Sequence, residues 1–260
     1  MQEHIKEQRV CIVTGSSSGI GAATAILYAE KGWRIVVNYS REAAPAEAVA
    51  EQCKAAGSPD VVVVKCNVAK DDDCRRLAAE VDQRWGRADV LVNNAGTTRF
   101  VDLKNLDGLT GEDFHAIYDV NVVGAYQMTR ALAPLLKRHP VTGVVNVSSI
   151  ASMMGTGSSI AYMASKGALN ALTAGLARAL GPEVRVNAIA PGLVDSRWLR
   201  EGLGAEKFES FVSSYKSRAA LADVLTPEDC AKACWFLGVD AVKTTGEVLL
   251  VDAGLRITKA

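Results

Sequence analysis

Seven short apolar runs rich in valine and isoleucine, separated by longer helix-forming stretches, most constrain what this chain can fold into. Each separating stretch is long enough for the helical crossover that joins parallel neighbours. Runs that are apolar at nearly every position are typical of strands buried on both faces. We therefore expect an α/β fold, a doubly wound parallel sheet of about seven strands flanked by helices. The predicted strands are residues 10–13, 35–37, 61–64, 90–92, 144–147, 184–189 and 248–251.

Length and charge favour one domain that acts on a small molecule. The 260 residues, 49% of them hydrophobic, suffice for one large core, and no repeat or Pro/Gly-rich linker divides them. We predict a single domain over residues 1–260. Lysine plus arginine and aspartate plus glutamate balance at 29 each, without a long basic run. This balance argues against a nucleic acid or an anionic membrane as partner and favours a small-molecule substrate.

The N-terminal segment and the cysteines indicate the compartment. Residues 1–9 are polar, and no apolar run approaches the ~20 residues of a membrane span. We therefore expect no secretory signal and a cytoplasmic protein. The six cysteines form no Cys-x-x-Cys pair, so we expect free thiols in small core sites and no metal site.

One stretch, residues 193–225, departs from the strand and helix alternation. It has mixed helical character, follows the sixth predicted strand on the ligand side, and contains Trp198, Phe208, Phe211 and Tyr215. Our functional interpretation is a helical lid over the substrate. The alternative is an ordinary helical insert at the surface.

A glycine-rich turn follows the first predicted strand. Gly15, Gly19 and Gly21 stand before and at the start of a helix predicted over residues 20–31. Glycines permit a tight turn and allow backbone N–H groups to approach a pyrophosphate at the positive end of the helix. The turn lacks the Gly-Lys-Ser/Thr ending of a nucleoside-triphosphate loop, which disfavours phosphoryl transfer. It predicts a dinucleotide site.

Tyr162 and Lys166 stand four residues apart in a predicted helix, with Ser149 thirteen residues upstream of the tyrosine. Residues i and i+4 share one helix face, so the ammonium group can favour the phenolate. For acid/base work at neutral pH, we expect the pKa of Tyr162 to be lowered by ~2–3 units from its usual value near 10.

Taken in order, these motifs give the chain a resemblance to the short-chain dehydrogenase/reductase family. The resemblance runs from Val10 to Gly254. The motifs that carry it are Thr14-Gly15-x3-Gly19-x-Gly21, Asn93-Asn94-Ala95-Gly96, Asn121, Ser149, Tyr162-x3-Lys166 and Pro191-Gly192. It implies a Rossmann-like fold and hydride transfer with a nicotinamide cofactor, without a metal.

The resemblance implies a catalytic tetrad. Tyr162 would transfer the proton to or from the substrate oxygen, and Lys166 would lower its pKa and bind the nicotinamide ribose. Ser149 would hydrogen-bond the reacting oxygen; the adjacent Ser148 does not have the family spacing, and neighbours at a strand end point in opposite directions. Asn121 would hold a water linked to Lys166, and it can also serve as a structural amide at a helix irregularity.

The end of the second strand indicates which cofactor binds. A carboxylate there selects NAD, but here the position is Tyr39, followed by Ser40 and Arg41, which can bind a 2′-phosphate. We expect NADP(H), with NAD(H) possible. Asn67 and Val68 stand where relatives carry an Asp-Val pair near the adenine, and the Asn67 oxygen can accept a hydrogen bond. Further cofactor-binding positions implied by the resemblance are Ser17, Ser18, Ile20, Asn94, Ala95, Gly96, Pro191, Gly192, Val194 and Ser196.

The helix predicted over residues 161–180 is rich in alanine and glycine. Small residues on several faces allow a second helix to approach closely. Similar proteins form dimers or tetramers through this helix and its neighbour, here residues 112–137, so we expect a homotetramer or a dimer. The alternative is that alanine is present only as a good helix former.

The leading functional hypothesis is an NADPH-dependent ketone reductase similar to the 3-oxoacyl thioester reductases. The alternatives are a sugar, polyol or secondary-alcohol dehydrogenase and, more remotely, a non-catalytic cofactor-sensing protein. The predicted substrate wall comprises Thr97, Thr98, Arg99, Met153, Met154 and the lid. Arg99 would meet an anionic group such as a carrier phosphate, or it is a surface charge.

Overall fold

The apolar runs form seven parallel strands in one sheet, in the order β3-β2-β1-β4-β5-β6-β7. The computed structural model describes residues 8–196, 199–200, 202 and 204–257. The strands are β1 (Val10–Val13), β2 (Arg34–Tyr39), β3 (Val61–Lys65), β4 (Val90–Asn93), β5 (Thr142–Val147), β6 (Val184–Pro191) and β7 (Val248–Val251). All seven strand predictions and the doubly wound fold are confirmed, with boundaries that differ by a few residues.

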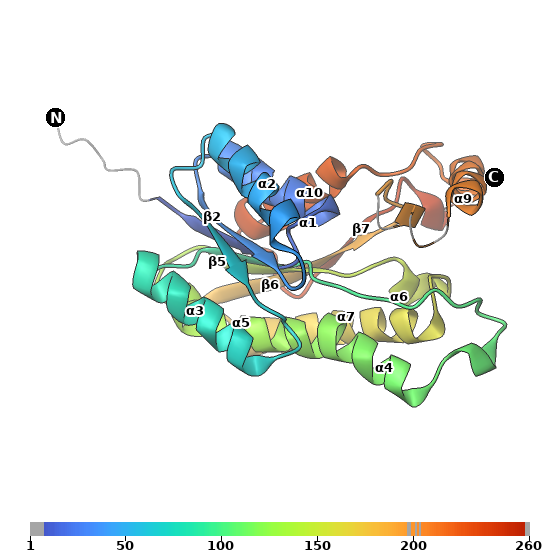
Figure 1. The fold of residues 1–260 in the computed structure, drawn as a ribbon, viewed down its shortest axis with the longest axis horizontal. Helices are drawn as coiled ribbons and strands as arrows, with labels where there is room; N and C mark the ends of the chain where they lie inside the picture. Colours follow the sequence, from blue (N-terminus) through green and yellow to red (C-terminus); the bar gives the residue numbers. More distant parts are fainter. Residues whose placement is uncertain (1–7, 197–198, 201, 203, 258–260) are drawn as a thin grey trace.

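Helices cover both faces of the sheet, which is why the central strands are apolar throughout (Figure 1). One face packs against α1 (Gly19–Glu30), α2 (Ala43–Ala55) and α10 (Pro227–Trp235). The other packs against α3 (Asp71–Trp85), α5 (Gly124–Leu136) and α7 (Ile160–Leu180). All six cysteines are buried and free, as predicted. No helix in the described ranges combines the length and apolarity that a bilayer crossing requires.

The remaining helices are short or interrupted. They are α4 (Gly111–Tyr118), α6 (Ala151–Met154), α9 (Ala205–Arg218), two π-helical segments, η2 (Asp119–Val123) and η3 (Phe236–Asp240), and two 3₁₀ turns, η1 (Leu106–Gly108) and η4 (Leu255–Ile257). The single helix predicted over residues 112–137 is therefore α4, η2 and α5 in succession. The i→i+5 bond from the Gly124 N–H to the Asp119 carbonyl marks the interruption.

The strand order reverses beside β1, where the chain has gone out to β3 and returns to β4. Val13, at the end of β1, pairs with Val37 of β2 and Val92 of β4. The segments after these strands therefore meet at the carboxyl edge of the sheet, the position where doubly wound sheets bind ligands.

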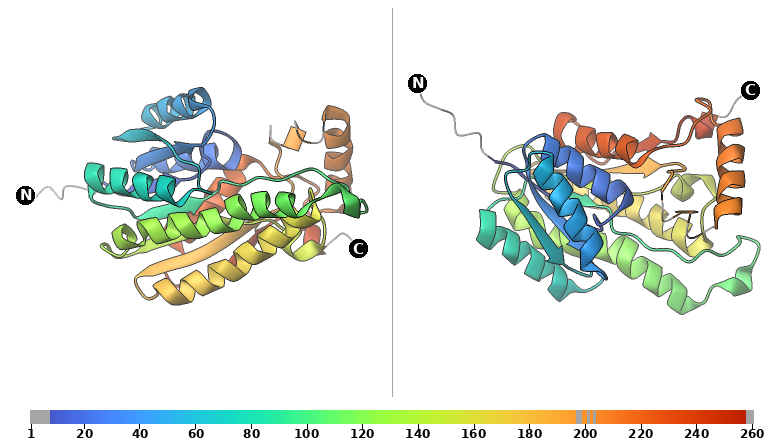
Figure 2. Two further views of the ribbon diagram at one scale, coloured as in Figure 1. Left: turned by 60° about the horizontal axis from the view of Figure 1, so that its bottom comes forward. Right: turned by 45° about the horizontal axis from the view of Figure 1, so that its top comes forward.

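Residues 193–225 form an excursion beyond this edge. Its two ends meet in a bridge between Val194 and Leu225, and the Leu225 N–H donates to the Leu193 carbonyl at 2.9 Å. Between them, α9 lies past the strand ends, away from the helical layers (Figure 2). The Tyr215 hydroxyl donates to the Asp252 carbonyl at 2.6 Å and fixes α9 to the segment after β7. Trp198 lies outside the described residues.

Candidate active site

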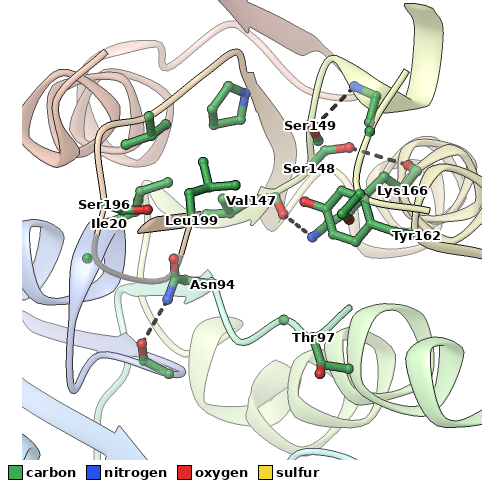
Figure 3. Close-up of a pocket in the computed structure, with 18 of the residues that line it drawn as sticks. Ile20, Asn94, Thr97, Val147, Ser148, Ser149, Tyr162, Lys166, Ser196 and Leu199 are labelled. Atoms are coloured by element: carbon green, nitrogen blue, oxygen red, sulfur yellow. Dashed lines mark hydrogen bonds between the residues drawn. The ribbon is translucent and has the colours of Figure 1, made fainter. Parts of the chain in front are cut away.

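A cavity of about 960 Å³ opens at the carboxyl edge of the sheet (Figure 3). Strand ends and the turns after them supply most of its lining: Gly15 and residues 17–20 after β1, Asn38, Ser40 and Arg41 from β2, 66–68 after β3, 94–97 after β4, 147–151 from β5, and 191–194 from β6. Nearly every element of the sheet therefore contributes to one site.

The glycine turn is held in shape by two asparagine side chains. The Gly15 N–H donates to the Asn38 side-chain oxygen at 2.9 Å. The Asn94 amide donates to the carbonyls of Thr14 and Gly15 at 3.0 and 2.9 Å. A Cβ on Gly21 would lie 2.4 Å from the Asn94 side-chain nitrogen, so only glycine fits there. The sequence reasoning missed the buried Asn38, although it directly precedes the predicted cofactor selector.

The N-terminus of α1 lines the cavity through Ser18, Gly19 and Ile20. Its N-cap, Ser18, makes no capping bond, and its first turn has no acidic residue. The first N–H groups of a helix need acceptors and favour negative charge. Together with the tight glycine approach, this end of the cavity fits the pyrophosphate of a dinucleotide.

Ser149, Tyr162 and Lys166 converge on one wall of the cavity (Figure 3). The Lys166 ammonium donates to the Val147 carbonyl at 2.8 Å and lies 5.6 Å from the Tyr162 ring centroid. Burial lowers the pKa of Lys166 to about 8. Burial raises the pKa of Tyr162 to about 12, and a hydrogen bond with Ser149 partly opposes that rise.

The expected lowering of the Tyr162 pKa is wrong for this arrangement. The phenolate would lose its hydration in the buried wall, and this cost exceeds any help from the ammonium group, which is turned toward Val147. Sequence spacing brings the two residues to one face of α7 but does not determine where the flexible lysine head points.

Hydrogen bonds distinguish the two adjacent serines. Ser148 is buried and its hydroxyl donates to the Asn170 side-chain oxygen at 2.6 Å. The Asn170 amide donates to the Ser152 hydroxyl at 2.9 Å, which donates to the Ser149 carbonyl at 2.6 Å. Ser148 thus has a structural network, whereas Ser149 bonds Tyr162, in agreement with its assignment. The sequence reasoning missed Asn170, although it continues the spacing of four from Tyr162 and Lys166.

Asn121 lies in the π-helical segment η2, so the helix irregularity is present. Its side-chain oxygen accepts from the Thr97 N–H at 2.8 Å, and its nitrogen donates to the Thr97 carbonyl and the Ser165 hydroxyl, both at 3.0 Å. The amide therefore joins the segment after β4 to α7. The water-relay role remains a prediction.

Most predicted cofactor positions line the cavity, and three predicted site residues do not. Ser40 and Arg41 line it, whereas Tyr39 packs against the core beside β2. Gly21 lies beneath the turn and Asn121 behind the wall. Asn67 lines the cavity, but its side-chain oxygen already accepts from the Ala69 N–H at 3.2 Å. The predicted positions that line the cavity are Gly15, Ser17, Ser18, Gly19, Ile20, Ser40, Arg41, Asn67, Val68, Asn94, Ala95, Gly96, Ser149, Tyr162, Lys166, Pro191, Gly192, Val194 and Ser196.

The predicted substrate wall is only partly right. Thr97 and Met154 line the cavity, but Thr98, Arg99 and Met153 do not. Arg99 instead forms two hydrogen bonds with Asp113 of α4, at 2.7 and 2.5 Å. Leu199, Lys207 and Arg218, which belong to the predicted lid, also line the cavity. Lining residues that the sequence reasoning missed on this side include Phe100, Ser158 and Leu255.

A dinucleotide-dependent oxidoreductase is the class of protein that this fold and this site define, because a phosphate-binding turn and a serine, tyrosine and lysine wall share one cavity. Within the described ranges, no three His, Cys, Asp or Glu side chains gather as a metal site would require.

Comparison with known proteins agrees with this class. A family model described as enoyl-(acyl carrier protein) reductase matches residues 15–256. A protein named as ketoacyl reductase 2 of the granaticin polyketide synthase of Streptomyces violaceoruber is 42% identical, covering 96% of this chain and 97% of that protein. A 3-oxoacyl-acyl-carrier-protein reductase of Synechocystis is 35% identical, covering 95% of this chain and 96% of that protein.

A solved structure extends the likeness to the fold. The chain superposes on a protein from Burkholderia xenovorans described as a short-chain dehydrogenase/reductase, with a TM-score of 0.89 at 41% identity, covering 97% of this chain and 99% of that one. The chain belongs to the short-chain dehydrogenase/reductase family, and it is a member similar to the 3-oxoacyl-acyl-carrier-protein reductases. The resemblance inferred from the motifs is confirmed.

Proposed function

We propose that the protein reduces the ketone of a 3-oxoacyl thioester to a secondary alcohol with NADPH. The observation that carries the proposal is the wall where Ser149 bonds Tyr162 beside the buried Lys166, in the same cavity as the helix N-terminus of α1. The names of the two relatives support carbonyl reduction of an acyl thioester. When bound, the nicotinamide supplies the hydride.

In the direction of ketone reduction, the residues of this wall would have complementary roles. The Ser149 hydroxyl is placed to hydrogen-bond the carbonyl oxygen, and Tyr162 is placed to protonate it as negative charge grows. A phenol whose pKa is about 12 is fully protonated at neutral pH, which suits a proton donor. Lys166 would hold the ribose hydroxyls near Tyr162, and its positive charge would stabilise the phenolate left after proton transfer.

Arg41 and Ser40 support the choice of NADPH. Both line the cavity after β2, where a 2′-phosphate would lie, and no carboxylate among the described lining residues opposes it. Asn94 and Asn38 would keep the turn open toward the pyrophosphate, and α9 would close over the substrate as a lid.

The test is reduced-nicotinamide absorbance with NADPH and NADH in parallel. The panel holds a 3-oxoacyl thioester, an enoyl thioester, simple and cyclic diketones, and sugars in the oxidative direction. We expect the fastest loss of NADPH with the 3-oxoacyl thioester. Faster loss of NADPH with the enoyl thioester would indicate reduction of a carbon–carbon double bond in place of a ketone. Preference for NAD with a sugar would favour the dehydrogenase alternative.

Tyr162→Phe tests the role of the hydroxyl in that assay. We expect turnover to fall by about 10²–10⁴, the usual contribution of a general acid, while NADPH still binds. Tyr126→Phe is the matched control, because Tyr126 lies on α5 with 42% exposure outside the cavity. A Tyr162→Phe protein with undiminished turnover would refute the role of Tyr162 as proton donor. A wild-type protein that binds NADPH but turns over none of these substrates would favour a cofactor sensor.

A further inference from the structure

One face of α9 forms a wall of the substrate side of the cavity. Lys207, Phe211, Tyr215 and Arg218 all line the cavity, and they follow one another at intervals of four, four and three residues. Such intervals place side chains on one face of a helix. The face therefore presents a cation at each end with aromatic rings between them.

The cavity carries only positive charge. Among the described residues, no aspartate or glutamate lines it, whereas Arg41, Lys166, Lys207 and Arg218 do. The whole chain has a formal net charge of zero, so this imbalance is local. Cations in a concave site with low-dielectric walls attract and concentrate anionic ligands.

Two cations close to the cavity pair with carboxylates, whereas the two α9 cations that line it pair with no described carboxylate. Lys216, on the other face of α9, pairs with Asp223 at 3.1 Å, and Arg200 pairs with Asp195 at 2.9 Å. Within the part of the chain that the structure describes, Lys207 and Arg218 form no ion pair. Among the residues that the structure describes, the hydrogen-bond acceptor of Arg218 is the Ser214 carbonyl of its own helix, at 3.1 Å.

The surface between the two cations is apolar. Phe211 is 42% exposed, and Phe100, Met154, Leu199 and Leu255 line the cavity with it. At 1.5 Å per residue, eleven residues separate the two cations along the helix by roughly 16 Å. They are therefore too far apart to hold one phosphate from both sides and instead match separate anionic groups on a long ligand.

We propose that Lys207 and Arg218 on α9 form a phosphate-binding subsite for the carrier arm of the substrate, a thioester of a phosphorylated pantetheine such as coenzyme A. The proposal rests on the proposed function, since it names how that thioester is recognised. Arg41 belongs to the cofactor end and Lys166 to the reacting centre, which leaves the two α9 cations for the carrier. Arg99 is paired with Asp113 and lies outside the cavity.

Paired substrates test the subsite by kinetics. Acetoacetyl-coenzyme A carries phosphates, and acetoacetyl-N-acetylcysteamine presents the same ketone without them. We expect Lys207→Gln and Arg218→Gln each to raise KM for the coenzyme A thioester at least 5-fold and to change KM for the neutral thioester less than 2-fold. Lys216→Gln removes the same charge from the outer face of α9 and is expected to change neither. Equal effects on both thioesters, or none, would overturn the proposal.

A binding measurement separates failure of the subsite from failure of the proposed function. Calorimetric titration compares coenzyme A, which carries a pyrophosphate and a separate 3′-phosphate, with pantetheine in the presence of NADP⁺ and needs no turnover. We expect the wild-type protein to bind coenzyme A at least 10-fold more tightly than pantetheine, and each α9 variant to lose a large part of that ratio. If the wild-type protein reduces neither thioester, the proposed function fails. The ratio of the two dissociation constants then decides by itself whether the phosphate-binding subsite exists. A ratio near one in the wild-type protein refutes it.

Discussion

At the residue scale, Tyr162 and Lys166 share one buried wall, and burial shifts their pKa values in opposite directions. Burial disfavours the charged form of each group, so the phenol is kept neutral and the ammonium group is brought closer to losing its proton. The wall therefore holds a neutral phenol beside a cation whose charge is costly to keep there. A charge retained at such cost is typical of a functional site.

This cost predicts that Lys166→Met stabilises the fold at neutral pH. The pKa of Lys166 falls from 10.5 to about 8 on folding, a difference of about 3 kcal/mol against the charged form. The unfolded state binds more protons between these values, so the cost is fully present below pH 8 and vanishes as pH rises to 10.5. Losing the bond to Val147 offsets part of it, leaving a gain of about 1–2 kcal/mol at pH 7.

Urea unfolding of both proteins at several pH values from 7 to 10 measures this difference. The advantage of Lys166→Met is expected to shrink steadily above pH 8, because only the wild-type protein has this group to titrate. The prediction is wrong if the variant is no more stable than the wild-type protein at pH 7 and the stability difference between them does not change with pH. Burial of the charged Lys166 would then not destabilise the fold.

At the element scale, spacing predicts the placement of residues well and their contacts poorly. The apolar runs define every strand, and the intervals from Ser149 to Lys166 bring Ser149, Tyr162 and Lys166 to one wall of the cavity, because helix and strand periods fix which backbone positions meet. A helix irregularity at Asn121 was one of the predicted alternatives, but its π-helical form in η2 was not predicted, since nothing in residues 119–123 breaks the helical pattern. Tyr39 lies outside the cavity that holds the other predicted cofactor positions, because its ring packs against the core. Local sequence does not encode this tertiary contact.

The first turn of α1 gives a prediction about a single methyl group. In Gly21→Ala the new Cβ would lie 2.4 Å from the Asn94 side-chain nitrogen and 2.6 Å from the Gly15 carbonyl oxygen. The turn must open, so we expect the NADPH dissociation constant to rise at least 10-fold while the sheet stays folded. Gly111→Ala, in the first turn of α4, meets no atom within 4 Å and needs no left-handed backbone, so it is the control. Titration of NADPH fluorescence measures both, and equal losses would contradict a local role for the turn.

At the scale of the whole molecule, the sheet buries the inner faces of the helices but leaves one broad outer face. There α7 packs beside α4 and η2, and these elements run side by side in the left view of Figure 2. Ala164, Ala171 and Gly175 of α7 are exposed, and so are Val123 and Tyr126 next to the π-helical segment. Small exposed residues beside apolar ones form a surface that a second helix pair can approach closely.

This face carries the prediction of a homotetramer or a dimer. Sedimentation equilibrium is expected to give about 110 kDa for a tetramer, four times the 27.5 kDa of one chain, or half that value for a dimer.

Ala171→Glu places a charge and a longer side chain on α7, and burying that charge against a second copy without a partner is costly, so the assembly is expected to dissociate. Ala48→Glu, also exposed but on α2 of the opposite layer, should leave the mass unchanged. A wild-type protein that sediments as a monomer, or two variants that behave alike, would mean that alanine serves α7 only as a good helix former.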